Sequence, residues 1–233
     1  MNPIVLARRA FLPLLMLAGF AVPAAAADVY VVHGIPGKDL GLPPELPVDI
    51  SVNGACALDD VVFGDVLGPV DLPTGAHEIE IRVSDGVEGT CSGLLAVTGR
   101  IDLAVAESAT VTAHLDQNGA ARITKFTNKV SETGKAARIA IVHTAAAPPV
   151  DVKARGEKGA KLQVRDLKNG HQSYAADVPA GAYKVKIGAS GGGTVFGPAE
   201  LSLESDVAYT AFAVGSLENE TFGVLILAIP LAE

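Results

Sequence analysis

The sequence is short of aromatic residues and of positive charge. It has no Trp, four Tyr and seven Phe in 233 residues. A surface that binds bases or sugars by stacking needs exposed aromatic rings, so this composition disfavours such a surface. Lys and Arg number 18 against 26 Asp and Glu, which gives a net charge of −8 at pH 7. Because nucleic acids and anionic lipid surfaces are bound through basic patches, we expect neither as a partner.

The sequence also lacks an apolar run long enough to stay in a membrane, which takes about 20 residues. Residues 11–22 are apolar, but they follow the basic pair Arg8–Arg9 and precede small residues before Asp28, a pattern typical of an export signal. We therefore assign residues 1–27 to a signal peptide, used either in general secretion or in the twin-arginine route. The mature chain is expected to be periplasmic or extracellular, with no integral membrane segment.

Cysteine is nearly absent, since Cys56 and Cys91 are the only two. In an exported protein such a pair predicts one disulfide bond. A disulfide that closes a loop of about 35 residues stabilises a fold by roughly 3 to 4 kcal/mol. Two alternatives stay open: a metal site, which two thiols without a paired His motif support weakly, and a redox pair, for which the C-x-x-C spacing is missing.

No stretch shows a convincing helical period, and short β-rich runs separated by turn residues are present instead. Seven strands are expected in the first half, at 29–33, 48–53, 60–66, 77–83, 94–98, 110–115 and 120–126. Seven more are expected at 138–143, 150–155, 161–165, 182–187, 199–203, 208–214 and 221–229. This number of short strands predicts an all-β fold of immunoglobulin-like or transthyretin-like β-sandwich type.

The two halves are copies of one another. The segments VVHG at 31–34 and PVDISVNG at 47–54 return as IVHT at 141–144 and PVDVKARG at 149–156. A second match relates DLPTGAH at 71–77 to DVPAGAY at 177–183. We therefore expect two tandem domains, residues 28–128 and residues 136–233, joined by a short polar linker at 129–135.

Each copy contains one His and one Asp in equivalent places, His33 with Asp49 and His143 with Asp151. Catalysis would need a nucleophile or a metal nearby, and no G-x-S-x-G or H-E-x-x-H frame accompanies them. We interpret the four residues as a structural motif that braces the connection between two strands. Accordingly, no catalytic residue, no cofactor and no metal site is predicted.

Charge is unevenly distributed, with 5 basic and 15 acidic residues in 28–128 and 9 basic and 10 acidic residues in 136–233. Asp59, Asp60 and Asp65 form the densest acidic group, which suits either calcium or, more simply, a solvated turn. The second half contains a basic run at Lys153, Arg155, Lys158, Lys161, Arg165 and Lys168. This run forms either a solvated hairpin face or a surface that docks on the acidic first domain, within or between molecules.

The V-V-H-x-x-P opening, the P-V-D-V-x-x-x-G strand and the D-[LV]-P-x-G-x-[HY] turn resemble the bacterial domain-of-unknown-function 4397 family over nearly all of residues 28–230. The resemblance implies an exported, sandwich-like domain in two tandem copies and brings no activity with it. Two features depart from the family pattern. The first copy has an insertion at 38–46, and the second has TAAA at 144–147 without the acidic residue of the family's short connection.

Together these features predict an exported, non-enzymatic binding or scaffold module of the cell envelope or the extracellular space. A protein or a cell-envelope glycan is the expected partner, recognised by loops at one end of a sandwich and above all by the insertion at 38–46. The alternative is a metal- or carbohydrate-dependent enzyme or accessory protein of the periplasm, which would bring acids and His together in one cleft.

Overall fold

The structure, a computed structural model, describes residues 26–231 apart from the side chain of Lys158. Of the predicted signal peptide, residues 1–27, the first 25 residues lie outside the described residues. Its last two residues, Ala26 and Ala27, are the first two of strand β1, and Ala27 is fully buried. Between residues 26 and 231 the regular structure is β apart from two short 3-10 helices, and no helix there is long and apolar enough to cross a membrane.

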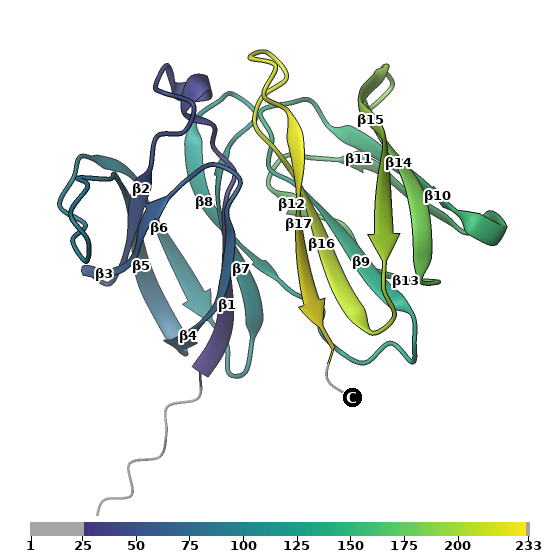
Figure 1. The fold of residues 1–233 in the computed structure, drawn as a ribbon, viewed down its shortest axis with the longest axis horizontal. Helices are drawn as coiled ribbons and strands as arrows, with labels where there is room; N and C mark the ends of the chain where they lie inside the picture. Colours follow the sequence, from purple (N-terminus) through teal and green to yellow (C-terminus); the bar gives the residue numbers. More distant parts are fainter. Residues whose placement is uncertain (1–25, 232–233) are drawn as a thin grey trace, which may run out of the picture.

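The first half of the chain forms a sandwich of two four-stranded sheets (Figure 1). The sheet that faces the second half is called the inner sheet, and the other is called the outer sheet. The inner sheet has the order β4 (Val66–Pro73), β1 (Ala26–His33), β7 (Ser108–Leu115) and β8 (Ala121–Thr127). The outer sheet has the order β3 (Ala55–Val61), β2 (Val48–Val52), β5 (Gly75–Val83) and β6 (Leu95–Leu103). The 3-10 helix η1 (Gly37–Leu40) lies between β1 and β2.

The second half repeats this topology. In its inner sheet, β12 (His171–Gln172) and β13 (Ala176–Val178) both pair with β9 (Ala137–His143), followed by β16 (Val207–Val214) and β17 (Gly223–Pro230). Its outer sheet has the order β11 (Lys161–Leu167), β10 (Val150–Gly156), β14 (Gly181–Ala189) and β15 (Thr194–Leu203), and η2 (Glu157–Gly159) connects β10 to β11. The structure thus confirms an all-β fold of two tandem sandwiches.

One predicted strand, at 60–66, is wrong. Residues 62–65 form a turn between β3 and β4, and β4 begins at Val66. Asp60 and Gly64 have φ angles of 51° and 97°, and the Val62 N–H donates to the Asp65 carboxylate at 2.9 Å. The apolar pair Val61–Val62 therefore ends one strand and enters a turn, although its composition favours a strand.

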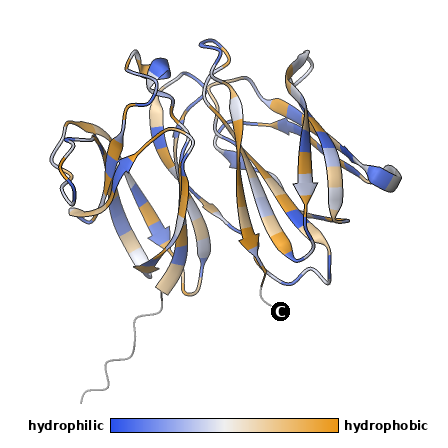
Figure 2. Cartoon of the chain, viewed as in Figure 1, coloured by the Kyte–Doolittle hydropathy of each residue, from blue (hydrophilic) through white to orange (hydrophobic). Residues whose placement is uncertain are grey.

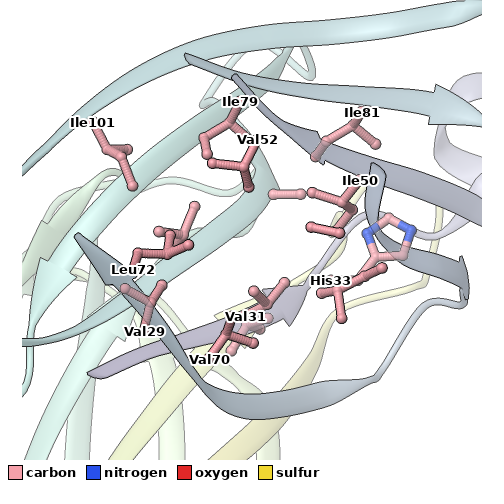
Figure 3. A pocket seen from close by; sticks show the side chains of 15 residues that line it. Val29, Val31, His33, Ile50, Val52, Val70, Leu72, Ile79, Ile81 and Ile101 are labelled. Carbon is pink, nitrogen blue, oxygen red and sulfur yellow. The ribbon is translucent and has the colours of Figure 1, made fainter. Parts of the chain in front are cut away.

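The outer sheets follow the alternation expected from the sequence. In β5 the side chains of Ile79 and Ile81 are buried in the first sandwich, and Glu78 and Glu80, which alternate with them, face outward. Figure 3 shows Ile79 and Ile81 together with apolar residues of the inner sheet in the interior of this sandwich. Each domain therefore has its own apolar core between its two sheets.

The central strands of the inner sheets are buried on both faces. All eight residues of β7 are buried, and so are all residues of β16 except Val207. Figure 2 shows that polar and apolar residues alternate in the outer strands, whereas β16 and β17 are mostly apolar. A strand buried on both faces must be covered on both sides, and the second cover of each inner sheet is the other domain.

A third apolar cluster fills the interface between the domains. It contains Val32 of β1 and Phe126 of β8 together with Val142, Phe212, Val214, Leu227 and Ile229 of the second domain. The Phe126 and Phe212 rings meet edge to face with their centroids 6.3 Å apart. The molecule is therefore a stack of four sheets in which the two inner sheets pack against each other.

Polar contacts fix the register of this interface. Asn169 Nδ2 donates to the backbone oxygens of Leu115 in the first domain, at 3.0 Å, and Ala145 in the second, at 2.7 Å. The Gly215 N–H donates to the Gly34 carbonyl at 3.3 Å. A Cβ atom on Gly34 would lie only 2.8 Å from Val214 Cγ1, so a glycine is needed where the two chains approach.

Candidate functional site

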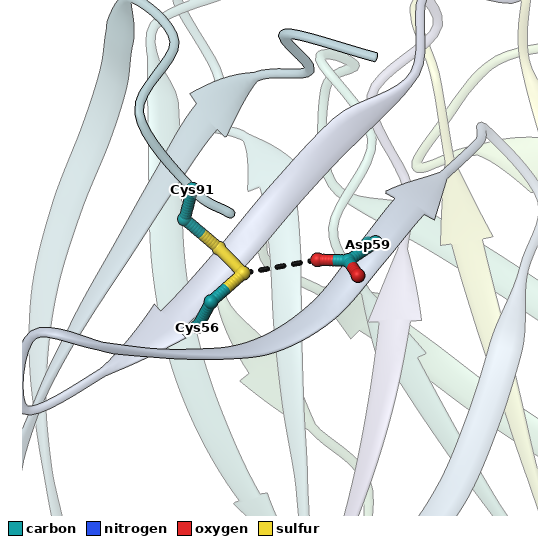
Figure 4. Close-up of side chains that lie close together, drawn as sticks. All are labelled: Cys56, Asp59 and Cys91. Carbon is teal, nitrogen blue, oxygen red and sulfur yellow. Dashed lines mark hydrogen bonds between the residues drawn. A yellow bond between two sulfur atoms is a disulfide. The ribbon is translucent and has the colours of Figure 1, made fainter. Parts of the chain in front are cut away.

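The predicted disulfide is present and joins Cys56 of β3 to Cys91 in the loop between β5 and β6 (Figure 4). Asp59 Oδ1 lies 2.9 Å from Cys56 Sγ, and its second oxygen accepts the Gly89 N–H at 2.7 Å. These three side chains form a group with metal-ligand atoms, but both sulfurs are bonded to each other and only the Asp59 carboxylate is left as a ligand. Disulfides persist in oxidising compartments, so this bond favours a location outside the cytoplasm.

A single carboxylate organises the loop that contains Cys91. Asp85 accepts hydrogen bonds from the backbone N–H groups of Val87 and Ser92, at 2.8 and 3.1 Å, and from the hydroxyls of Thr90 and Ser92. The hydrogen bonds from Ser92 and Thr90 hold the pKa of Asp85 at about 2. The loop at 84–94 is therefore tied down by its own side chains as well as by the disulfide.

The three residues of the acidic group do not converge. Asp59 accepts from Gly89 N, Asp60 Oδ1 accepts from the Ser84 hydroxyl at 2.6 Å, and Asp65 Oδ2 accepts from Val62 N. Calcium requires several oxygen ligands around one point. Asp59 and Asp60 instead hold two points of the loop at 84–94, and Asp65 holds the turn at 62–65.

The motif aspartates share one structural role. Asp49 Oδ1 accepts the N–H of Asp60 at 3.1 Å, and Asp151 Oδ1 accepts the N–H of Asp166 at 2.9 Å. Asp60 and Asp166 both have a φ of 51°, which is the left-handed conformation. Each motif carboxylate therefore holds a left-handed residue of the neighbouring strand, and among the described side chains neither is hydrogen-bonded to its motif His.

The motif histidines end β1 and β9 with their rings buried. Burial lowers the pKa of His33 to about 4 and also lowers the pKa of His143. His143 Nε2 faces the Pro148 carbonyl at 3.1 Å and donates to it, which braces the connection to β10. The Nδ1 atoms of both rings are buried without a hydrogen-bond partner. The rings are therefore neutral at pH 7.

The family-type turn before β5 and β14 also has a physical basis. His77 Nε2 lies 2.7 Å from the Pro73 carbonyl, and the Tyr183 hydroxyl donates to the Pro179 carbonyl at 2.8 Å. Asn53 Nδ2 donates to His77 Nδ1 at 3.0 Å, so Nε2 carries the proton and donates to Pro73. Sequence reasoning aligned these two positions but did not identify the contact, because only the folded turn brings ring and carbonyl together.

The insertion at 38–46, which the sequence favours as the recognition loop, is held in part by the second domain. Lys38 Nζ donates to the Asn219 carbonyl at 2.8 Å, and the Thr221 hydroxyl donates to the Asp39 carboxylate at 2.7 Å. Asn219 and Thr221 belong to the loop between β16 and β17 of the second domain. Lys38 and Asp39 therefore make interdomain contacts, although Lys38 and Leu40 are exposed like the tip of the insertion at 41–45.

Exposed apolar side chains gather on two loops of the first domain. They are Leu40, Leu42, Val87, Leu94 and Leu95, which are called the apolar loop residues, and they are five of the eight large apolar side chains found exposed in residues 26–231. The two loops leave the same end of the outer sheet, because the Ser84 N–H donates to the Pro47 carbonyl at 3.0 Å. A small cavity of about 60 Å³ beneath the insertion is lined by Leu42 and by Val83 of β5.

Lys153, Arg155, Lys161 and Arg165 of the basic run lie on the outer sheet of the second domain, on the side away from the first domain (Figure 1). Lys158 is in η2, and Lys168 follows the end of β11. The prediction that the basic run docks on the first domain within one molecule is therefore wrong, because the inner sheets occupy that interface. The outward face also contains Lys184 and Lys186 of β14, which sequence reasoning missed because the pairing of β10 with β14 is not visible in the chain order. We call Lys153, Arg155, Lys161, Arg165, Lys184 and Lys186 the basic face, and all six are exposed.

Comparison with known proteins gives one family. The profile of the domain of unknown function DUF4397 matches at residues 27–153 and again at residues 139–230. No curated protein matches this chain in sequence.

Solved structures give only distant similarities. A candidate cell adhesion protein from Bacteroides ovatus is 9% identical, with a TM-score of 0.28, over 89% of this chain and 98% of that one. The Bacillus anthracis TIE protein is 11% identical, with a TM-score of 0.23, over 90% of this chain and 32% of that one. A candidate cell adhesion protein from Bacteroides eggerthii is 9% identical, with a TM-score of 0.21, over 90% of this chain and 97% of that one. Similarities at this level say nothing about what the chain binds.

Proposed function

Because this chain belongs to the domain-of-unknown-function 4397 family and contains two copies of its domain, we propose that it is an exported, non-enzymatic binding or scaffold module. Its place is the periplasm or the cell exterior, as the export-type N-terminal sequence and the disulfide favour. The four-sheet stack serves as a rigid support, and recognition takes place on its outward surfaces.

The observation that supports this function best is the arrangement of the basic face. Lys153 of β10 lies directly opposite Lys186 of β14, and Arg155 lies between Lys161 of β11 and Lys184 of β14. Like charges directly opposite each other destabilise a sheet. Four ion pairs are found in residues 26–231, and none of them includes a member of the basic face. Arg165 Nη2 donates to Gln163 Oε1 at 3.4 Å, and Lys184 lies opposite Glu200 of β15. A face with this excess of like charges and without an ion pair fits a surface that meets an anion.

The partner that fits this face is an acidic glycan of the cell envelope. A flat row of Lys and Arg at cross-strand spacing matches charges repeated along an extended polymer, and Arg adds paired hydrogen bonds to carboxylate or phosphate. In the first domain the positions equivalent to Lys184 and Lys186 are Glu78 and Glu80. Binding is therefore assigned to the second domain alone.

The test is retention of the mature protein on immobilised polygalacturonate, compared with neutral dextran, across a salt gradient. The double variant Lys153→Gln/Lys186→Gln should bind about tenfold more weakly, since each lost charge pair is worth roughly 0.2 to 1 kcal/mol. The matched control Lys129→Gln/Lys135→Gln removes the same charge from the linker region and should bind like the wild type. Equal weakening in both variants, or equal retention on dextran, would reject the proposed surface.

A protein partner is a second candidate, and the observation that favours it is the apolar loop residues. The loop at 84–94 is held by the disulfide and by Asp85, so it loses little entropy on binding, which favours recognition. If a protein binds there, Leu42→Ser/Leu94→Ser should abolish cross-linking to envelope proteins while leaving retention on polygalacturonate unchanged. Unchanged cross-linking in this variant would exclude the loop end as the binding surface.

A further inference from the structure

The second sandwich contains an interior cavity that the first one largely lacks. Its volume is about 170 Å³, and it lies between the two sheets, lined almost wholly by hydrocarbon from β9, β10, β14, β15, β16 and β17. The corresponding space in the first sandwich, shown in Figure 3, is about 40 Å³. The two domains share one topology, so their inward-facing residues can be compared position by position.

Three inward positions around the cavity carry smaller side chains in the second domain. Val52 opposite Ile79 in the first domain corresponds to Ala154 opposite Val185 in the second. Val111, paired with Val31, corresponds to Ala211, paired with Ile141. Other positions are larger in the second domain, since Ile139 and Ile141 replace Val29 and Val31, and the register places Phe196 at the position of Val97. The cavity therefore lies where the small side chains of Ala154, Val185 and Ala211 line the space between the sheets.

The two sandwiches also differ at the edge formed by β6 and β8 in the first domain and by β15 and β17 in the second. In the first domain Gly99 of β6 packs on Ile123 of β8, and a Cβ atom on Gly99 would lie only 2.7 Å from Ile123 Cβ. The register places Ala199 of β15 at the position of Gly99, since Gly99 pairs with Ile79 and Ala199 pairs with Val185. A methyl group at this position prevents the edge strands from closing as they do in the first domain.

This edge gives the cavity its entrance. Ala199 is half-buried and lines the cavity, and the next residue, Glu200, also lines it and is exposed. On the opposite edge strand, β17, Val224 and Ile226 complete the wall. The cavity thus reaches solvent between β15 and β17 and is not sealed in the core.

We propose that this cavity binds a small, uncharged, apolar molecule about the size of one aromatic ring. A closed apolar cavity of about 150 Å³ stays dry and takes up benzene or xenon, because water finds no hydrogen-bond partners there. Apart from Glu200 at its entrance, the side chains that line this cavity are likewise hydrocarbon. A ligand of that size restores the dispersion contacts that the missing methyl groups leave unmade. This binding site is separate from the basic face and does not depend on it.

The experiment uses benzene as the probe and the mature two-domain protein. Saturating benzene should raise the thermal midpoint of the wild type by about 2 to 4 °C, because it binds the folded state only. The variants Ala154→Val and Ala211→Val place first-domain residues in the second domain, so each should reduce the shift, and the double variant should abolish it. Ala182→Val adds the same atoms on the exposed side of β14 and should keep the full shift.

A second measurement keeps the test valid if the double variant does not fold. In methyl NMR spectra of the wild type, benzene should move the signals of Ala154 and Ala211 and leave those of Val52 and Val111 in place. No midpoint shift in the wild type, an equal shift in a folded double variant, or signal changes in the first domain would each overturn the proposal.

Discussion

Three buried histidines link the stability of this protein to pH. Burial lowers the pKa values of His33, His114 and His143, in the case of His33 from 6.5 to about 4. His33 faces the interior of the first sandwich, and His143 lies near His114 across the domain interface. All three rings are therefore neutral in the folded protein under conditions where the unfolded chain would bind protons.

The stability should fall as the pH is lowered from 7 to 5. The unfolded state binds a proton at His33 below pH 6.5 and the folded state only below about pH 4, so stability is full above 6.5 and is lost through this window. His33 alone should account for about 2 kcal/mol between pH 7 and pH 5. Urea unfolding at both pH values measures this. His33→Gln should reduce the dependence of the unfolding free energy on pH, whereas a substitution of the exposed His171 by Gln should leave that dependence unchanged. The same change of stability with pH in both variants would contradict the role of His33.

The disulfide between Cys56 and Cys91 also contributes to the stability of the fold. Replacing Cys56 and Cys91 by Ser should lower the free energy of unfolding by about 3 kcal/mol, since a closed loop of this length restricts the unfolded chain. Urea titration of the variant, compared with the reduced wild type, checks this. A variant as stable as the oxidised wild type would mean that Asp85 and its hydrogen bonds alone hold the loop.

Among the elements, the pairs β2–β3 and β10–β11 depend on the motif aspartates. Asp49→Ala or Asp151→Ala would leave the N–H of a left-handed residue without its acceptor, at a cost of about 1 to 3 kcal/mol each. Asp→Asn retains a carbonyl oxygen and should cost less at both positions. Chemical unfolding of the four variants measures these costs. If Ala and Asn lower the free energy of unfolding equally, the carboxylates do not act as acceptors for these N–H groups.

Element by element, the sequence was most informative where one face is buried and the other is solvated. The alternation in 77–83 predicted β5, and the repeated PVD motif predicted β2 and β10. Strand β4 and the short strands β12 and β13 were missed, because Gly, Pro and polar residues obscure their pattern and the pairing with β1 or β9 is long-range.

The same limits apply to the candidate sites. The Cys56–Cys91 pairing followed from compartment chemistry, whereas the partners of Asp49 and Asp151 depend on a left-handed residue in another strand. The full burial of β16 had a visible signal in its sequence AYTAFAV, which has little polar alternation and is typical of a strand covered on both faces. This pattern in β16 therefore indicates a second layer over the inner sheet, which is the other domain.

At the scale of the whole molecule, the interface should make the two domains unfold together. Phe212→Ala removes a fully buried ring from the interface and should cost about 3 to 5 kcal/mol. Calorimetry should then resolve two transitions where the wild type has one. Tyr174→Ala, at a side chain that is 97% exposed, is the control and should change nothing. A single unchanged transition in the Phe212 variant would show that the domains fold independently of this contact.

The packing of equivalent inner sheets also has a consequence for how such a molecule assembles. In a single copy of the domain, the apolar face of the inner sheet that points away from the sandwich core would be exposed to water. The isolated subunit of a dimer exposes its interface in the same way. The chain from Thr127 to Ala137 joins the two domains. It therefore fixes the effective concentration of one domain relative to the other, which is on the order of millimolar for a short flexible connection. The tandem repeat is thus a covalent dimer, one that dilution in an open environment cannot dissociate.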